Sequence, residues 1–327
     1  MSASEDIKVG DFTSRGPVPR VYGEALVEAA REDARIVCLG ADLSPATETD
    51  LFRDTLPDRY HNFGIAEANM IGAAGGMARC GEIPFAHTFA VFATRRPYDQ
   101  VALQVAYPRA NVKIVGFLPG LTTLLGVSHQ AIDDIALMRA LPGMTIVEPA
   151  GMEQVRAAVR AAAAHPGPVY LRMRRADAPL PPDFAPRALT IGRADVLREG
   201  GDGAVFACGT MVAVAQAAAT ALAARGRQVA VVDMHTIKPL DADAVLAFAR
   251  ETRCVVTAEN HSIVGGLGSA VAEVLAESGL GTGFARVGIH DTFGEGGSTP
   301  YLFDKYGLSA AAIAAAFERL WSRHAGN

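Results

Sequence analysis

The chain lacks most of the motifs that identify an enzyme class at a glance. Its 327 residues contain no GxxxxGK[ST] phosphate loop, no HExxH, no GxSxG and no metal-spaced cysteine or histidine cluster. Four cysteines lie far apart without a CxxC pair, as expected for small core residues in a reducing compartment. These absences argue against phosphate-loop, zinc-protease and serine-hydrolase chemistry.

Strong charge and long apolar runs are also missing. The net charge is −5 and the pI about 5.9, which argues against nucleic acid or an anionic membrane as a partner. The first 20 residues contain no apolar signal core, and no apolar run is long enough to cross a bilayer. We therefore expect a soluble, cytoplasmic protein. Half of the residues are apolar, which is ample for the cores of two domains.

What the chain does contain is an alternation of strands and helices, interrupted once. The first series begins near Arg20, and a second begins near Ile191 after four prolines within 176–186. The fold class predicted is α/β, with two consecutive domains, each a mostly parallel sheet flanked by helices. The predicted divisions are a flexible tail at 1–17, a first domain at 18–178, a linker at 179–190 and a second domain at 191–327.

The predicted elements follow from apolar periodicity. In the first domain we expect strands at 35–39, 83–86, 112–117, 144–147 and 169–173, and helices at 22–31, 67–79, 92–106, 131–140 and 152–164. In the second domain we expect strands at 204–208, 229–233, 254–257 and 285–288, and helices at 211–225, 242–250, 268–277 and 310–323.

Glu67 is the most informative single residue. It stands at the start of a predicted helix that is rich in glycine and alanine as far as Gly76. Small residues let a helix approach another backbone closely, so its surface is a candidate for burial. A buried carboxyl is suited to hydrogen-bond a heterocycle nitrogen or to move its proton. The alternative is an exposed glutamate on an ordinary amphipathic helix.

Other chemistry-bearing side chains follow predicted strands of the first domain. Asp42 closes the first strand, Phe89 and Phe92 follow the next, and His129 ends a long loop after the strand at 112–117. Ligands bind outside the carboxyl ends of strands in open α/β sheets. A carboxylate, aromatic faces and a histidine together suit a flat heteroaromatic ligand. Core packing is the alternative for the phenylalanines.

Three glycine or histidine features carry a weaker signal. The segment 265–268, GGLG, precedes a helix and is a weak phosphate-loop signal, for which close packing of the helix start is the preferred explanation. His261 and His290 stand apart from the other candidates and are interpreted as structural or surface residues.

Several motifs together resemble the C-terminal half of transketolases. They occur in the family's order from about Arg20 to Tyr306: GIAEANM (64–70), TFAVF (88–92), YDQ (98–100), GVSHQ (126–130), IKPLD (237–241), TAENH (257–261) and GGLGS (265–269). The resemblance implies a pyrimidine-binding domain followed by a transketolase C-terminal domain. It also implies thiamine diphosphate as cofactor.

The resemblance assigns roles to the matched residues of the cofactor site. Glu67 matches the catalytic glutamate that hydrogen-bonds a ring nitrogen of the aminopyrimidine, so that the ring can remove the thiazolium proton. Phe89 matches the aromatic residue that stacks on this ring, with Phe92 beside it. Asp42 and Leu43 match residues that line the cofactor.

The resemblance also implies a substrate site. His129 matches a catalytic histidine that contacts sugar oxygens near the reacting carbon. Arg20 and Arg175 match arginines that bind the sugar phosphate, a task suited to a planar guanidinium. For Arg175 and its neighbour Arg174, the alternative is a solvated basic cluster, and the match leaves open which of the two faces the substrate.

Three positions depart from the family pattern. Leu125 replaces an acidic residue four before the histidine, Phe117 replaces a phosphate-binding histidine and Ala46 replaces a phosphate-binding serine. The anion site is therefore expected to be weaker, and the donor and acceptor sugars are left open.

The family's other half is not recognisable in this chain. No Gly-Asp-Gly…Asn motif for Mg²⁺ and diphosphate is present, because the 201–203 GDG lies in the wrong domain and lacks a suitably spaced asparagine. The resemblance therefore implies one subunit of a split transketolase. It would transfer a two-carbon ketol unit from a phosphorylated or otherwise anionic ketose to an aldose. The Mg²⁺ ligands would come from a separate diphosphate-binding subunit, in a heterotetramer with two copies of each chain.

Three alternatives stay open. The chain could be the beta subunit of a 2-oxo-acid dehydrogenase decarboxylase component, although the 126–130 and 237–241 motifs favour transketolase. It could be the C-terminal half of a 1-deoxyxylulose-5-phosphate-synthase-like enzyme, which uses pyruvate. It could also be a non-catalytic regulatory subunit, which the presence of Glu67, Phe89 and His129 argues against.

Overall fold

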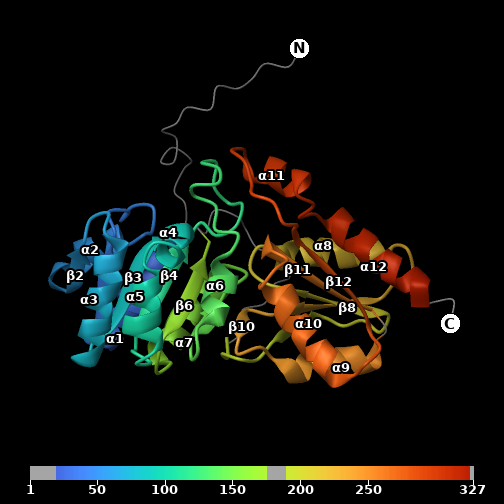
Figure 1. Ribbon diagram of the computed structural model, residues 1–327, viewed down its shortest axis with the longest axis horizontal. Helices are drawn as coiled ribbons and strands as arrows, with labels where there is room; N and C mark the ends of the chain where they lie inside the picture. Colours follow the sequence, from blue (N-terminus) through green and yellow to red (C-terminus); the bar gives the residue numbers. More distant parts are fainter. Residues whose placement is uncertain (1–19, 175–188, 253, 325–327) are drawn as a thin grey trace, which may run out of the picture.

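The computed structural model describes residues 20–174, 189–252 and 254–324, which form two α/β units side by side (Figure 1). The predicted tail at 1–17 and most of the predicted linker lie outside the described residues. Each unit has a sheet that is mostly parallel and covered by helices, which confirms the predicted fold class.

The first sheet has seven strands in the order β10-β5-β6-β4-β3-β1-β2. All neighbours are parallel except β10, which comes from the second half of the chain and runs antiparallel to β5. The strands are β1 (Ile36–Gly40), β2 (Tyr60–Asn62), β3 (Ile83–Phe89), β4 (Lys113–Phe117), β5 (Thr145–Val147), β6 (Val169–Met173) and β10 (Thr236–Lys238).

Both faces of this sheet are covered because successive side chains of a strand point to opposite faces. Ile36 and Cys38 pack in one apolar cluster with α1 and α7, whereas Val37 and Leu39 pack in another with α3, η3 and α6. The helical elements are α1 (Val21–Glu32), α2 (Asp50–Thr55), η2 (Pro57–Arg59), α3 (Glu67–Arg79), α4 (Ala90–Thr94), α5 (Tyr98–Gln100), η3 (Val101–Ala106), α6 (Asp134–Ala140) and α7 (Met152–Ala164).

The second sheet has five strands in the order β12-β11-β8-β9-β7, of which only β7 is antiparallel to its neighbour. Its strands are β7 (Asp195–Arg198), β8 (Gly203–Ala207), β9 (Val229–Asp233), β11 (Cys254–Ser262) and β12 (Gly283–Ile289). Its helices are α8 (Met211–Ala223), α9 (Ala242–Glu251), α10 (Leu267–Ser278), α11 (Thr299–Lys305) and α12 (Ala310–His324).

One apolar core runs across both units. Phe206 of β8, Val232 of β9 and Leu267 of α10 belong to the same buried cluster as Met138 of α6 and Ile146 of β5. Each such side chain contributes roughly 1.5–3 kcal/mol when it leaves water. The second unit therefore fixes the position of α6, and with it the loop that precedes this helix.

The helix expected at 92–106 is broken in the structure. α4 ends at Thr94, a turn passes through Pro97, and the chain continues as α5 and then as the π-helix η3. Proline has no amide hydrogen and its ring clashes with the preceding helical turn, so the break falls there. The elements α2, β2, β7, β10 and α11 were not expected. Each has only three to seven residues, which is too short to show a clear apolar periodicity.

β11 is longer than the expected strand at 254–257. It continues to Ser262 through Glu259, Asn260 and His261, three polar residues that are at most 1 % exposed. Polar letters suggest a loop when they are read alone, but here each side chain has a buried partner. In the described part of the chain, no helix is both long and apolar enough to cross a membrane.

Candidate functional site

The candidate residues of the first unit lie at one edge of its sheet. Asp42 follows β1, Glu67 follows β2, Phe92 follows β3 and His129 follows β4, while Phe89 is the last residue of β3. These four strands are mutually parallel, so their carboxyl ends meet at the same edge. This is the edge at which open α/β sheets bind ligands.

Glu67 is buried rather than exposed. It is the first residue of α3, its side chain is only 4 % exposed, and Arg96 Nη1 donates to its Oε1 over 2.7 Å. Glycine in α3 allows this helix to pack closely against η3. A Cβ on Gly75 would stand 2.7 Å from the carbonyl oxygen of Gln104 in η3, so only glycine permits the two helical segments to lie this close.

Phe89, Phe92 and His129 form an aromatic cluster beside this carboxylate. The Phe92 ring centroid lies 6.0 Å from that of Phe89 and 5.1 Å from that of His129. The guanidinium carbon of Arg96 lies 3.9 Å from the Phe92 centroid and so links the cluster to Glu67. Although they come from three different segments, the carboxylate, the two aromatic faces and the imidazole are neighbours.

The surroundings of His129 favour the neutral form of its imidazole. Partial burial lowers its pKa from the usual value, and the positive charge of Arg96 lowers it further. Ser128 Oγ lies 2.9 Å from its Nδ1. A neutral imidazole can accept a proton at one nitrogen and donate at the other, which is the property needed beside sugar hydroxyl and carbonyl oxygens.

The remaining candidates are less closely grouped. Asp42 is exposed with a φ of 60°, and its backbone amide donates to Asn62 Oδ1 over 3.1 Å. Leu43 is half-buried against the core cluster that contains α1. Arg20 pairs with Asp50 of α2, so its charge is partly compensated.

Arg175 lies outside the described residues, and Arg174 is the last described residue before that gap. Among the departures from the family pattern, Phe117 is fully buried at the end of β4, where its ring meets that of Tyr22 at 5.2 Å edge to face. Ala46 packs half-buried against the core, whereas Leu125 is 39 % exposed in the loop before His129.

The second unit holds the loop that carries His129. Asn260 of β11 accepts from the amide of Leu121 over 3.0 Å and donates to the carbonyl of Pro119 over 3.4 Å. Gln130 Nε2 donates to the carbonyl of Glu295 over 2.9 Å. Both ends of the loop are therefore tied to the second unit, a link that no local sequence pattern reveals.

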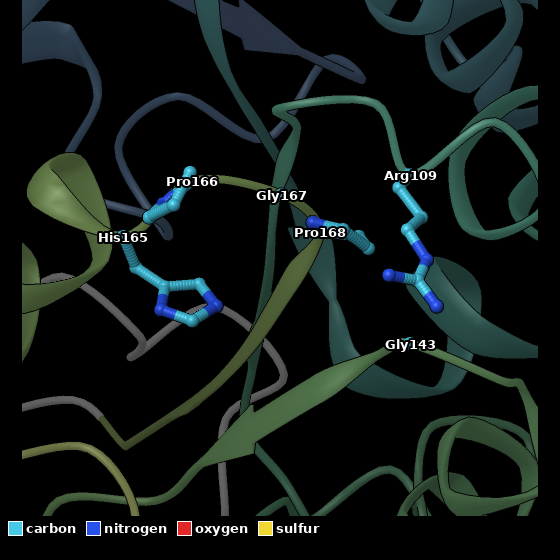
Figure 2. A pocket seen from close by; sticks show the side chains of 6 residues that line it. All are labelled: Arg109, Gly143, His165, Pro166, Gly167 and Pro168. Carbon is cyan, nitrogen blue, oxygen red and sulfur yellow. The ribbon is translucent and has the colours of Figure 1, made fainter.

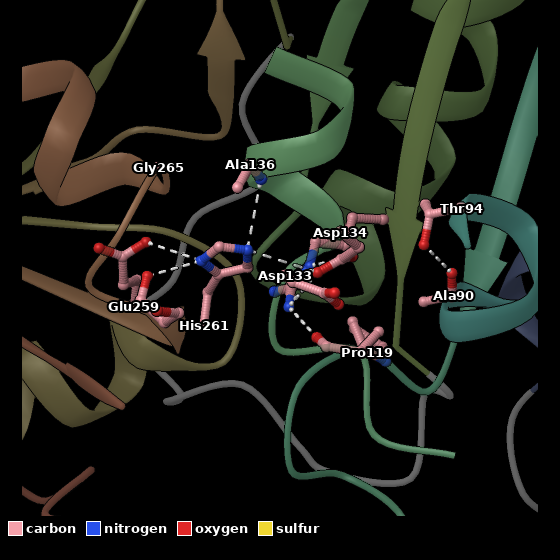
Figure 3. A network of polar contacts seen from close by, with 12 residues as sticks. Ala90, Thr94, Pro119, Asp133, Asp134, Ala136, Glu259, His261 and Gly265 are labelled. Carbon is pink, nitrogen blue, oxygen red and sulfur yellow. Dashed lines mark hydrogen bonds and ion pairs between the residues drawn. The ribbon is translucent and has the colours of Figure 1, made fainter. Parts of the chain in front are cut away.

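A buried polar network lies beneath this link (Figure 3). His261 stands between Glu259 and Asp134, with 3.8 Å separating the nearest nitrogen and oxygen atoms on each side. Its Nδ1 donates to the carbonyl of Ser262 over 2.7 Å, and burial lowers its pKa to about 4. His261 is therefore a neutral structural residue, whereas His290 lies exposed after β12.

The glycine-rich segment at 265–268 hydrogen-bonds a carboxylate of the same chain, that of Glu259. The Glu259 carboxylate accepts from the amides of Leu267 and Gly268, at 2.7 and 2.8 Å, at the start of α10. A Cβ on Gly266 would stand 1.9 Å from Glu259 Oε2. The segment thus serves close packing around a buried carboxylate, and its helix start is not available to a diphosphate.

The described residues contain no group of three or more His, Cys, Asp or Glu side chains that could hold a metal ion. An open hollow does exist, lined by Arg109, Gly143, His165, Pro166, Gly167 and Pro168 (Figure 2). It lies where β5 and β6 begin, so it is at the opposite edge of the sheet from Glu67 and is separate from the candidate site.

Comparisons with known proteins agree with this arrangement. Residues 18–181 match the family described as "Transketolase, pyrimidine binding domain", and residues 192–313 match "Transketolase, C-terminal domain". The chain is 48 % identical over 303 residues, covering 92 % of this chain and 94 % of the relative, to the "6-deoxy-6-sulfo-D-fructose transketolase subunit SqwH" of a Clostridium species.

Two further comparisons are informative. A "1-deoxy-D-xylulose-5-phosphate synthase 1" of Geobacter sulfurreducens is 35 % identical over 96 % of this chain but only 50 % of its own length. A solved structure described as "Split gene transketolase, inactive beta4 tetramer" is 46 % identical, with a TM-score of 0.85 over 93 % of this chain and 97 % of that one. The chain therefore belongs to the transketolase family and contains that family's pyrimidine-binding and C-terminal domains.

Proposed function

We propose that this chain is the pyrimidine-binding subunit of a split transketolase, which transfers a ketol unit between sugars with thiamine diphosphate. The observation that carries the proposal is the cluster of Glu67, Phe89, Phe92 and His129 at the carboxyl edge of the first sheet. We assign 18–178 to the pyrimidine-binding domain, 179–190 to the linker and 191–327 to the C-terminal domain.

The chemistry of this cluster fits the aminopyrimidine half of the cofactor. A buried carboxylate can face a ring nitrogen, and Phe89 and Phe92 offer faces on which a flat ring stacks. Bound thiamine diphosphate would supply a carbon nucleophile and an electron sink for cleavage of a carbon–carbon bond. The protein has to bind, orient and exchange protons with this group.

Each residue of the cluster then has a physical task. Glu67 holds a proton at the ring nitrogen, and its burial keeps water from competing for that contact. Phe89 and Phe92 fix the plane of the ring. His129, whose lowered pKa favours the neutral imidazole, hydrogen-bonds the sugar oxygens close to the reacting carbon.

The diphosphate half of the cofactor needs a second chain. The described residues offer no metal cluster, and Glu259 already fills the helix start that the glycine-rich segment creates. We assign Mg²⁺ and diphosphate binding to a separate subunit, in a heterotetramer with two copies of each chain. The solved relative is described as an inactive tetramer of beta chains, which supports the view that this kind of subunit alone lacks turnover.

The surface beside Glu67 suits such a partner. Ile65, two residues before the carboxylate, is 74 % exposed; Leu103 of the adjoining η3 is 55 % exposed, and Tyr107, directly after η3, is 85 % exposed. Gly72 and Gly76 of α3 have open space where a Cβ would stand, so another backbone can approach closely. We assign this face to the diphosphate-binding subunit, because that chain must hold the cofactor beside Glu67.

The donor we propose is a ketose with a terminal anion. Arg20, which lies at the start of α1, and Arg175 are the candidate ligands for a phosphate or sulfonate. A sulfonated ketose is named in the description of the relative that is 48 % identical. The departures at Phe117 and Ala46 remove two phosphate contacts of the family, which favours a sulfonate, since it carries less charge than a phosphate.

The test is a coupled assay with and without a diphosphate-binding subunit and Mg²⁺. We expect turnover only from the complex, with 6-deoxy-6-sulfofructose or fructose 6-phosphate preferred over fructose. Glu67→Gln should lower the rate roughly 10²–10⁴-fold, whereas Glu24→Gln, on the exposed side of α1, should not change it. Turnover by this chain alone, or an unaffected Glu67→Gln complex, would contradict the proposal. Turnover with pyruvate in place of a ketose would favour deoxyxylulose-phosphate synthase chemistry instead.

A further inference from the structure

Arg96 makes the most specific contact with Glu67. It lies in the turn between α4 and α5, next to Pro97, and its Nη1 donates to Glu67 Oε1 over 2.7 Å. The Glu67 side chain is 4 % exposed and that of Arg96 is 46 % exposed. The carboxylate is therefore held inside the protein by a cation that approaches it from the solvent side.

The guanidinium of Arg96 also lies over the ring of Phe92, with its central carbon 3.9 Å from the ring centroid. It thus presents a flat, positively charged group to an aromatic face and an N–H donor to a buried carboxylate. A protonated aminopyrimidine ring would make the same two kinds of contact in this cluster. Arg96 and such a ring would compete for Glu67.

We propose that Arg96 is a latch, which occupies Glu67 in the chain without cofactor and leaves when the aminopyrimidine ring enters. This inference rests on the proposed function, because it takes the cluster to be the ring site. The side chain can leave without disturbing the core, since almost half of it is already exposed. Glu67 stays in place because it belongs to the first turn of α3.

A latch lowers the apparent affinity for the ring in proportion to the fraction of molecules in which the latch is open. Removing it should therefore tighten the binding of a ligand that reads only the ring site. Thiamine is such a probe, because it lacks the diphosphate. We expect Arg96→Ala and Arg96→Gln to bind thiamine about tenfold more tightly than the unchanged chain, which corresponds to about 1.4 kcal/mol.

The measurement is a ligand-observed NMR titration of the full chain with thiamine, which requires no catalysis. Arg95→Ala is the matched control, because Arg95 is the adjacent residue and carries the same charge but pairs with Asp133 over 2.8 Å. Its affinity for thiamine should stay within about twofold of the unchanged chain. Far-ultraviolet circular dichroism of each variant confirms that it has folded.

The outcomes separate the latch from the proposed function. Weaker or unchanged thiamine binding by both Arg96 variants overturns the latch, because Arg96 would then support the ring or stand apart from it. Glu67→Gln should weaken binding in every background. If Glu67→Gln binds thiamine as well as the unchanged chain, the ring site itself is refuted and the latch with it.

Discussion

Replacing Arg172 tests how the two units are held together. Arg172 of β6 is fully buried, and its Nε donates to Asp134 Oδ2 over 2.8 Å. Its Nη1 donates to Glu148 Oε1 over 2.7 Å, and its Nη2 donates to the carbonyl of Asn260 in the second unit over 2.9 Å. Burial raises the pKa of Asp134, but the charge of Arg172, together with His261 and the hydrogen bonds from Arg172 and Tyr170, outweighs burial and lowers that pKa.

The change Arg172→Met keeps the length of the side chain and removes the charge. Two carboxylates then remain buried without their cation, a loss that typically costs about 3–5 kcal/mol. At roughly 2.1 cal/mol/K per residue, the unfolding entropy of the 327-residue chain is about 0.7 kcal/mol/K. We therefore expect the melting temperature to fall by about 4–7 °C.

Scanning calorimetry at pH 7 measures this shift. Arg156→Met is the matched control, because Arg156 also pairs with two carboxylates, those of Glu24 at 2.5 Å and Glu28 at 3.3 Å, but at the surface. Surface pairs typically contribute less than about 1 kcal/mol. If Arg172→Met melts within 1 °C of this control, the buried network does not stabilise the contact between the units, and the reasoning is wrong.

Three further predictions follow from single contacts. Burial raises the pKa of Asp233 to about 8, so the folded state keeps a proton that the unfolded chain loses above about pH 4, and the free energy of unfolding should fall as the pH rises from 4 to 8. Urea unfolding at pH 5 and pH 8 should show a smaller fall for Asp233→Asn than for the unchanged chain. An equal fall in both proteins would contradict the assignment. Gly266→Ala should destabilise the isolated chain by about 1–3 kcal/mol, since its Cβ would overlap Glu259, while Gly72→Ala, with open space, should be neutral or slightly stabilising in the same thermal melt. Asn260→Ala leaves the buried amide of Leu121 without its acceptor, so the amide hydrogen exchange of residues 119–130 should accelerate. Protection from exchange equal to that of the unchanged chain would show that Asn260 does not hold this loop.

Sequence patterns were sufficient to predict the two-domain α/β architecture and the sheet edge that carries Asp42, Phe89 and His129. Runs such as 112–117 and 169–173 are apolar enough to be buried on both faces, which predicts parallel strands covered by helices. Because parallel strands end at one edge, the order of the residues along the chain is enough to place Asp42, Phe89 and His129 at that edge. Glu67 follows the short strand β2, which the periodicity does not predict, so its place beside Phe92 and His129 came from the structure. The ordered motifs supplied the family, and the comparisons confirm it.

The partners of these residues could be identified from the packing of the two units and not from the sequence. Arg96 is 29 residues from Glu67, and Asn260 is 139 residues from the amide that it holds, so neither contact leaves a local pattern. The polar end of β11 looked like a loop, although Glu259 and His261 are buried between the units. A buried polar group needs a partner, and which partner it receives depends on how the two sheets pack, because local periodicity reports burial of a face and not the contacts made across it.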